Sequence, residues 1–324
     1  MKVIFNAKKA FGFLDVTPEL KQRFELVFSK LAEQVLTGAN YNNLESIIAT
    51  DNFVDDVLAF QRENLNGVEG VTSNEYGRAF GKMIYVPTQE KYYVFLDAEY
   101  ASFLIDDTIF DAIISNLNGD KELTNCIVVQ RQCAMNLLAH ELEHYKFANS
   151  QTAPIVDVDN LDSQYERMMF ELFDEYNAAR KATEVSSVSV FSYDEEYMLK
   201  IEKYIMDNRW KYNTREIDLN QFVALFHQYT RQALMYIAAN IGSKHGSEND
   251  KNIFDSCRCS PLIRALEEDF DCLFTKAHKG EKVIISTRLI DWLKEYYELF
   301  KVYISKTAQG LYYEIPYDEG DAEV

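Results

Sequence analysis

Two of the five histidines in this 324-residue chain stand four residues apart, in the segment His140-Glu141-Leu142-Glu143-His144. On a helix, residues i and i+4 share one face with Cβ atoms about 5–6 Å apart, so both imidazoles can reach one tetrahedral zinc ion. Glu141 is rotated about 100° from His140 and can lean toward a water on the metal without binding the metal. The spacing predicts zinc held by His140 and His144, with Glu141 as general base.

A zinc site needs at least one further protein ligand. The remaining histidines all lie far downstream, at His227, His245 and His278. The next predicted helix offers Glu175, and the residues that follow it on its face are small enough for a close helix approach: Ala178, Ala179 and Ala182. We predict Glu175 as the third ligand. Glu171, one turn earlier on the same face, is the alternative ligand. Glu175 could instead be an ordinary solvated carboxylate on the helix surface.

Other polar residues near the motif have weaker functional interpretations. Glu143 lies on the other flank of the metal side, where it could orient a ligand, although a surface charge is the simpler interpretation. His227 is a candidate for stabilising an oxyanion, but its apolar helix neighbours favour a buried, hydrogen-bonded histidine. A second zinc site is conceivable at Cys257, Cys259, Cys272 and His278, but their spacing matches no standard pattern and favours free thiols.

The elements that must position these residues are predicted to be mostly helical. The motif helix is expected over about 125–147, with a core-facing stripe opposite the histidines formed by Met135, Leu138, Leu142 and Tyr145. Before it, β-branched and aromatic residues predict two strands or a hairpin over 78–86 and 92–96. Other helices are expected from Pro18 with Thr17 as N-cap, over 43–65, over 108–117, and over 287–304. Three capping pairs predict the starts of further helices. Ser163 with Glu166 starts a helix that runs to about residue 183, Ser192 with Glu195 starts a second, and Asp218 with Gln221 starts a third that stops before Gly242.

This pattern predicts an α+β, mostly helical fold in several parts. We expect an N-terminal helical segment over 1–70 that packs on a core over 71–185, a helical domain over 190–317, and an acidic tail over 318–324. A serine-rich stretch at Ser186, Ser187 and Ser189 is the best linker candidate.

Composition limits the partners. The chain carries 33 Lys and Arg against 52 Asp and Glu, a formal charge of −19, which argues against binding to nucleic acid or anionic lipid. A basic regulatory protein partner remains compatible. Neither a signal peptide nor a membrane span is evident, and five unevenly spaced cysteines do not suggest a disulfide framework. We therefore expect a cytoplasmic protein.

The motif followed by Glu175-Tyr176-Asn177-Ala178 resembles the gluzincin branch of the zincin metallopeptidases. In that family two motif histidines and a glutamate from a following helix bind zinc, and the motif glutamate is the general base. The resemblance covers about residues 78–184. It implies a zincin-like catalytic core, with a small β-sheet or hairpin before the motif helix, that hydrolyses peptide bonds.

Two gluzincin-like groups share particular features with the chain. The E-Y-x-A run is similar to that of membrane-associated CAAX-type endopeptidases, but Ala179 stands where they have aspartate, and membrane function is not carried over. Soluble ImmA/IrrE-like peptidases are similar in compartment and in having strands before the motif helix, although Glu143 stands where they commonly have glycine. The resemblance also suggests that 92–96 is an edge strand for substrate; an ordinary core strand is the alternative.

These observations predict a cytoplasmic zinc metalloendopeptidase that acts on a specific protein substrate. The alternative is a binding or regulatory protein that keeps the zincin scaffold without turnover. A third interpretation is a helical interaction protein in which the motif arose by chance.

Overall fold

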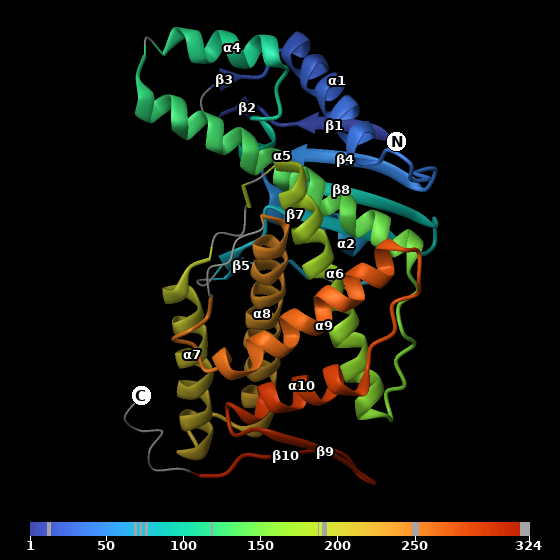
Figure 1. Ribbon diagram of the computed structural model, residues 1–324, viewed down its shortest axis with the longest axis vertical. Helices are drawn as coiled ribbons and strands as arrows, with labels where there is room; N and C mark the ends of the chain where they lie inside the picture. The colour runs from blue at the N-terminus through green and yellow to red at the C-terminus, as the bar shows by residue number, and fades with distance from the viewer. Residues whose placement is uncertain are drawn as a thin grey trace. The chain divides into compact units, whose positions relative to one another are not determined.

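The computed structural model describes residues 1–11, 14–67, 70–71, 73–74, 77–117, 119–186, 188–189, 193–247 and 253–317. These residues form an α+β, mostly helical fold, as predicted (Figure 1). Within the described ranges, contacts divide the chain into a first unit, Met1–Asn149 with Ala178–Val190, and a second unit, Ser150–Asn177 with Phe191–Val324. The predicted acidic tail over 318–324, and Ser187 and Ser192, lie outside the described residues. None of the helices in the described ranges has the length and apolar character needed to cross a bilayer.

A four-stranded sheet organises the first unit. Its order is β1 (Lys2–Asn6), β4 (Leu44–Thr50), β8 (Lys91–Asp97) and β7 (Gly81–Val86), with β1, β4 and β8 parallel and β7 antiparallel to β8. The hairpin predicted from residues 78–96 is therefore confirmed. The expectation that 92–96 forms an edge strand is wrong, because β8 is paired on both sides and β7 lies at the edge. Two short strand pairs accompany the sheet: β2 (Lys9–Ala10) with β3 (Leu14–Asp15), and β5 (Ser73–Asn74) with β6 (Gly77–Arg78).

The helix predicted over 43–65 is wrong in its first half, which forms β4. Ile47 packs in one hydrophobic cluster and Ile48 packs against another, so both faces of this strand are covered. A parallel strand buried on both faces has a nearly continuous apolar run, which short segments of helix can imitate. The second half forms α2 (Phe53–Asn64).

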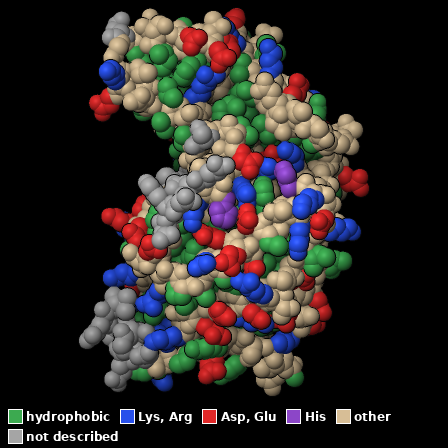
Figure 2. All heavy atoms as spheres, viewed as in Figure 1, with side chains coloured by type: hydrophobic (Ala, Val, Ile, Leu, Met, Phe, Trp, Pro, Cys, Tyr) green, Lys and Arg blue, Asp and Glu red, His purple; other side chains and the backbone are tan. Residues whose placement is uncertain are grey.

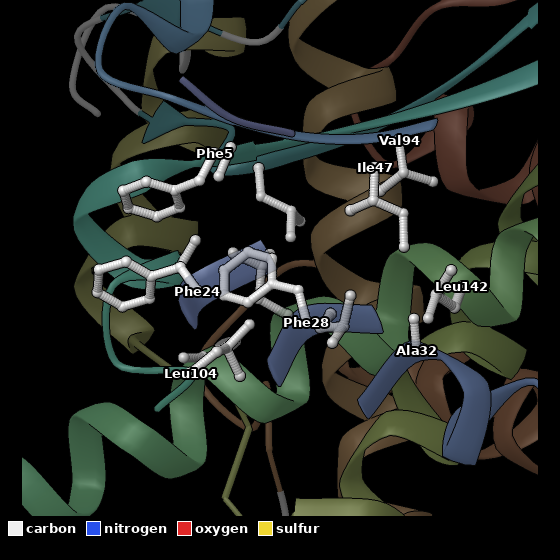
Figure 3. Close-up of a cluster of buried hydrophobic side chains, with 14 of the residues drawn as sticks. Phe5, Phe24, Phe28, Ala32, Ile47, Val94, Leu104 and Leu142 are labelled. Atoms are coloured by element: carbon white, nitrogen blue, oxygen red, sulfur yellow. The ribbon is translucent and has the colours of Figure 1, made fainter. Parts of the chain in front are cut away.

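Helices cover both faces of this sheet. On one face lie α1 (Pro18–Val35) and α5 (Lys121–Ser150). As predicted, Thr17 is the N-cap of α1 and accepts a hydrogen bond from the Leu20 N–H. Two shorter helices, α3 (Ala98–Ala101) and α4 (Asp107–Asn116), precede α5 in the chain. In Figure 3, side chains from the strands point toward those of α1 and α5, as Phe5, Phe28, Ile47, Val94 and Leu142 illustrate. Alternate residues of β8 point the other way, toward α2.

The apolar stripe predicted on the motif helix is the face that packs. Leu138, Leu142 and Tyr145 are fully buried in the cluster, and Met135 packs against it. This packing sets the rotation of α5 about its axis, and so directs the opposite face, with His140 and His144, away from the sheet core.

The second unit is built from helices and one hairpin. Its elements are α7 (Glu195–Asn213), α8 (Leu219–Gly246), α9 (Ser260–His278), α10 (Thr287–Glu298), and the antiparallel pair β9 (Tyr303–Thr307) and β10 (Gly310–Glu314). The helix α6 (Leu161–Ser186) is continuous and contributes residues to both units. The capping box of Asp218 and Gln221 at the start of α8 is confirmed.

Three predicted helix boundaries in this part are wrong. α6 begins at Leu161, because the Asn160 side chain accepts hydrogen bonds from the N–H groups of Asp162 and Ser163. The Ser163 hydroxyl instead accepts a hydrogen bond from the Asp157 N–H (2.8 Å) in the preceding loop. α8 continues past Gly242 to Gly246, with Gly242 inside the helix. α10 ends at Glu298, and the residues from Tyr303 onward form a strand instead of the end of a helix.

Candidate metal centre

The two motif histidines converge on one point beside α5. Their Nε2 atoms lie 3.0 Å apart, and the rings meet nearly at right angles, with centroids 4.6 Å apart. His140 is buried and His144 half-buried. Two ring nitrogens at this distance repel unless one carries a proton or a cation lies between them, so the pair is suited to share a metal ion.

Glu175 of α6 completes a group of three potential ligands. One ligand atom from each of His140, His144 and Glu175 lies within 4.8 Å of the others. Ligands of a tetrahedral zinc with bonds of about 2.0–2.1 Å are separated by about 3.3 Å, and the Nε2 atoms of the two histidines lie near that separation. Two imidazoles and a carboxylate also leave a fourth position open, as in catalytic zinc sites. The donor set therefore fits a metal ion, and the three residues predicted as ligands lie together.

Glu171, the alternative ligand, is directed elsewhere. Its carboxylate accepts hydrogen bonds at 2.8 Å from both Arg167 and Arg231, and it is not part of the three-residue group. Burial by itself would raise the pKa of Glu171, but Arg231 and Arg167 outweigh that effect and hold the pKa below its usual value. The two carboxylates are one helical turn apart, yet one faces histidines and the other faces arginines.

The neighbours of Glu175 in the chain hold this part of α6 in place. Tyr176 is fully buried, and its hydroxyl forms a 2.7 Å hydrogen bond with Nδ1 of His245 at the end of α8. Its ring packs against Phe173 and Phe270. The alanines predicted to form a small face are buried as well: Ala178, Ala179 and Ala182. Anchoring on both sides of Glu175 limits rotation of the helix at that position.

Sequence reasoning missed the surroundings of Glu141. A Cβ atom placed on Gly81, the first residue of β7, would lie 2.7 Å from Cγ and 2.8 Å from Cδ of Glu141. The carboxyl group of the predicted base thus lies against the beginning of the edge strand, and only 6% of the residue's surface is exposed. No signal in the sequence distinguishes Gly81 from glycines in turns, because the contact joins segments 60 residues apart.

Glu143 is also buried and has a partner of its own. Its Oε1 atom accepts a hydrogen bond of 2.5 Å from Nζ of Lys146, three residues further along α5. This ion pair accounts for the burial of its charge. An additional role in orienting a ligand stays a prediction.

The other predicted candidates lie apart from the three ligands. His227 is half-buried, burial lowers its pKa, and its Nε2 atom forms a 2.7 Å hydrogen bond with the hydroxyl of Tyr313, as expected for a structural histidine. Cys257 and Cys259 are buried, whereas Cys272 is exposed. Among the described residues, His140, His144 and Glu175 form the one group of three or more ligand-type side chains close enough to share an ion.

No protein-family model matches this chain, and no curated protein or solved structure is significantly similar to it.

Proposed function

We propose that this protein is a zinc-dependent metallopeptidase of the gluzincin type that acts on a specific protein or peptide substrate. The observation that carries the proposal is the convergence of His140, His144 and Glu175, with the buried Glu141 next to His140 in the chain. When bound, zinc would supply Lewis-acid chemistry, polarising a scissile carbonyl and lowering the pKa of a water to about 7.

Glu141 is the general base of the proposed reaction. Its position beside His140 in the helix lets it take a proton from the attacking water and return that proton to the leaving amine. Its burial supports this role, because a carboxylate with little access to bulk water interacts more strongly with a nearby proton donor. The ligands His140, His144 and Glu175 hold the metal and take no part in the proton transfer.

The edge strand β7 is the proposed binding surface for an extended substrate. Within the described part of the sheet, β7 is hydrogen-bonded to β8 alone, so its other side can pair with a peptide by strand addition. Gly81 at its start lies against Glu141, so a peptide along β7 would pass beside the base. This assignment replaces the strand over 92–96 that the sequence suggested.

The proposed partner is a protein or peptide, with neither nucleic acid nor a membrane involved. The formal charge of −19 disfavours polyanions. Figure 2 shows acidic and basic side chains interspersed on the face in view, with no continuous basic surface there. A cytoplasmic location and a regulatory protein partner also belong to the proposal. The alternative remains a zincin-fold binding protein without turnover, but a purely structural metal site has no need for Glu141 beside it.

Metal content and peptide cleavage test the proposal together. We expect the protein purified without chelator to hold about one zinc ion per chain and to cleave members of an unstructured peptide library. Glu141→Gln should keep the zinc and lower kcat at least about 100-fold, since general-base catalysis contributes 10²–10⁴-fold. Glu122→Gln, an exposed change on the same helix, is the matched control and should leave kcat unchanged.

Each failure has a separate meaning. A protein that neither contains zinc nor takes it up on addition contradicts the whole proposal. Zinc binding without cleavage of the library, or of cell proteins in N-terminal profiling, favours the binding protein without turnover.

A further inference from the structure

Gly81 occupies an unusual position for a glycine in a strand. A positive φ angle is not what requires glycine there, because the positive-φ glycines are found at other positions: Gly38, Gly67, Gly119, Gly280 and Gly310. What distinguishes Gly81 is that the Glu141 side chain lies where a Cβ atom of this residue would be. A Cβ atom on it would come closer than 3.0 Å to three atoms of Glu141, whereas a Cβ on Gly70 would meet nothing within 4 Å.

We propose that Gly81 is a positioning residue for the general base: its missing side chain leaves the volume that the Glu141 carboxyl group occupies. The inference rests on the proposed function for the role of Glu141, but the contact itself does not. The orientation of the base is then set by strand β7 as well as by helix α5.

The strand cannot easily move to make room for a larger residue. Gly81 pairs with Leu96 in the antiparallel register of β7 and β8, and that register continues to Val86 opposite Lys91. Directly before it, the Phe80 carbonyl accepts a 2.8 Å hydrogen bond from the Asp97 N–H. Shifting Gly81 would disturb these backbone hydrogen bonds, each of which contributes to the stability of the sheet.

The helix is equally constrained on the other side of the contact. Leu138, Leu142 and Tyr145 are fully buried in the core and hold α5 in its rotation. With both backbones held, an added methyl group at position 81 must be accommodated by the Glu141 side chain. That side chain would rotate away from its present position, because the three atoms nearest to the added methyl group all belong to Glu141.

Gly81→Ala tests the inference, with Gly70→Ala as matched control. A displacement of about 1 Å in a reacting group can cost about 100-fold in rate, so we expect Gly81→Ala to lower kcat by about that factor. KM and the zinc content should stay within about threefold of wild type. Gly70→Ala should change none of these values, because its added methyl group points into open space. An unchanged kcat in Gly81→Ala overturns the inference.

A double-mutant cycle provides a readout that needs neither metal nor activity. In metal-free protein, Gly81→Ala should lower the melting temperature by about 3 °C, as expected for mild overpacking. In the Glu141→Ala background, where the crowded atoms are gone, the same change should have almost no effect. Equal destabilisation in both backgrounds overturns the inference. If wild-type protein binds zinc but cleaves nothing, the proposed function fails while the cycle still decides whether Gly81 positions Glu141.

Discussion

Two regions of this protein place potential metal ligands close together in the sequence, and they differ in outcome. In α5, His140 and His144 are four residues apart and bring their Nε2 atoms to 3.0 Å, where Glu175 joins them. Before α9, Cys257 and Cys259 are two residues apart and buried, but they do not form part of any three-ligand group among the described residues. The thiols of Cys257 and Cys259 also interact with each other, but the cysteines belong to no group of three ligand-type residues in the described part of the chain, whereas Glu175 joins the two histidines.

The carboxylates beside these regions, the buried Glu202 and the half-buried Glu175, have different partners. Glu202, near the two cysteines, accepts a 3.0 Å hydrogen bond from the backbone N–H of Arg258, just before α9 begins. Burial raises the pKa of Glu202, and hydrogen bonds from the backbone of Arg258 and Cys259 only partly offset that effect. Glu202 thus serves the start of a helix, where carboxylates are favourable, whereas Glu175 lies with the two histidines.

The largest effect is expected for Glu175, the third ligand-type residue, which joins the two histidines in the first region. Losing a residue that merely supports a metal ligand typically costs 10–100-fold in affinity, so Glu175→Gln should weaken zinc binding by at least about 100-fold. Glu171→Gln, one turn away and bound to arginines, should change zinc affinity by less than about threefold. Competition with a chelator of known affinity measures both variants.

Two other results would contradict this distinction between the histidine region and the cysteine region. If Glu171→Gln loses the metal and Glu175→Gln keeps it, the ligand assignment is wrong. A loss of bound zinc in a Cys257→Ser variant would show that the second region also binds metal.

A smaller effect concerns Glu202 and pH. A carboxyl group whose pKa is raised on folding contributes stability that is present below its unfolded pKa of about 4.5 and is lost as pH rises through the folded pKa. Relative to Glu202→Gln, wild-type protein should therefore become more stable as pH is lowered from 7 to 4.5. Urea denaturation at both pH values measures the difference. A constant difference would mean that the environment of Glu202 does not penalise its charge.

The smallest effect has the opposite sign and concerns Glu171. Because its pKa is lowered on folding, its stabilising contribution is present above about pH 4.5 and is lost as pH falls through the folded pKa. Its partners are partly exposed, so Glu171→Gln should cost about 0.5–1 kcal/mol at pH 7. That cost should disappear near pH 3 in the same denaturation assay. A cost that persists at pH 3 would indicate lost packing instead of a lost ion pair.

Local patterns predicted several elements well. Thr17 and Pro18 start α1, Asp218 and Gln221 start α8, and the apolar stripe of α5 faces the core. These features depend on residues a few positions apart in the chain, so propensity, capping and periodicity are sufficient to predict them. The convergence of the two histidines belongs to the same class, because a single helix sets their separation.

Contacts between segments distant in the chain decided the features that local patterns did not predict. The segment over 44–50 became a strand because β1 and β8 flank it and both its faces are covered, although its apolar residues also fit a helix. Pairing on both sides likewise made β8 an interior strand and left β7 at the edge.

The sequence by itself determined that this chain is an α+β, mostly helical protein in which one helix carries two histidines at a spacing that brings their ring nitrogens together. Only the tertiary structure decided that Glu175 lies with those histidines while Glu171 faces Arg167 and Arg231. It alone also brought Gly81 against Glu141. The physical reason is that helical spacing acts over a few residues, whereas the partners of a buried carboxylate depend on which distant segments pack around it.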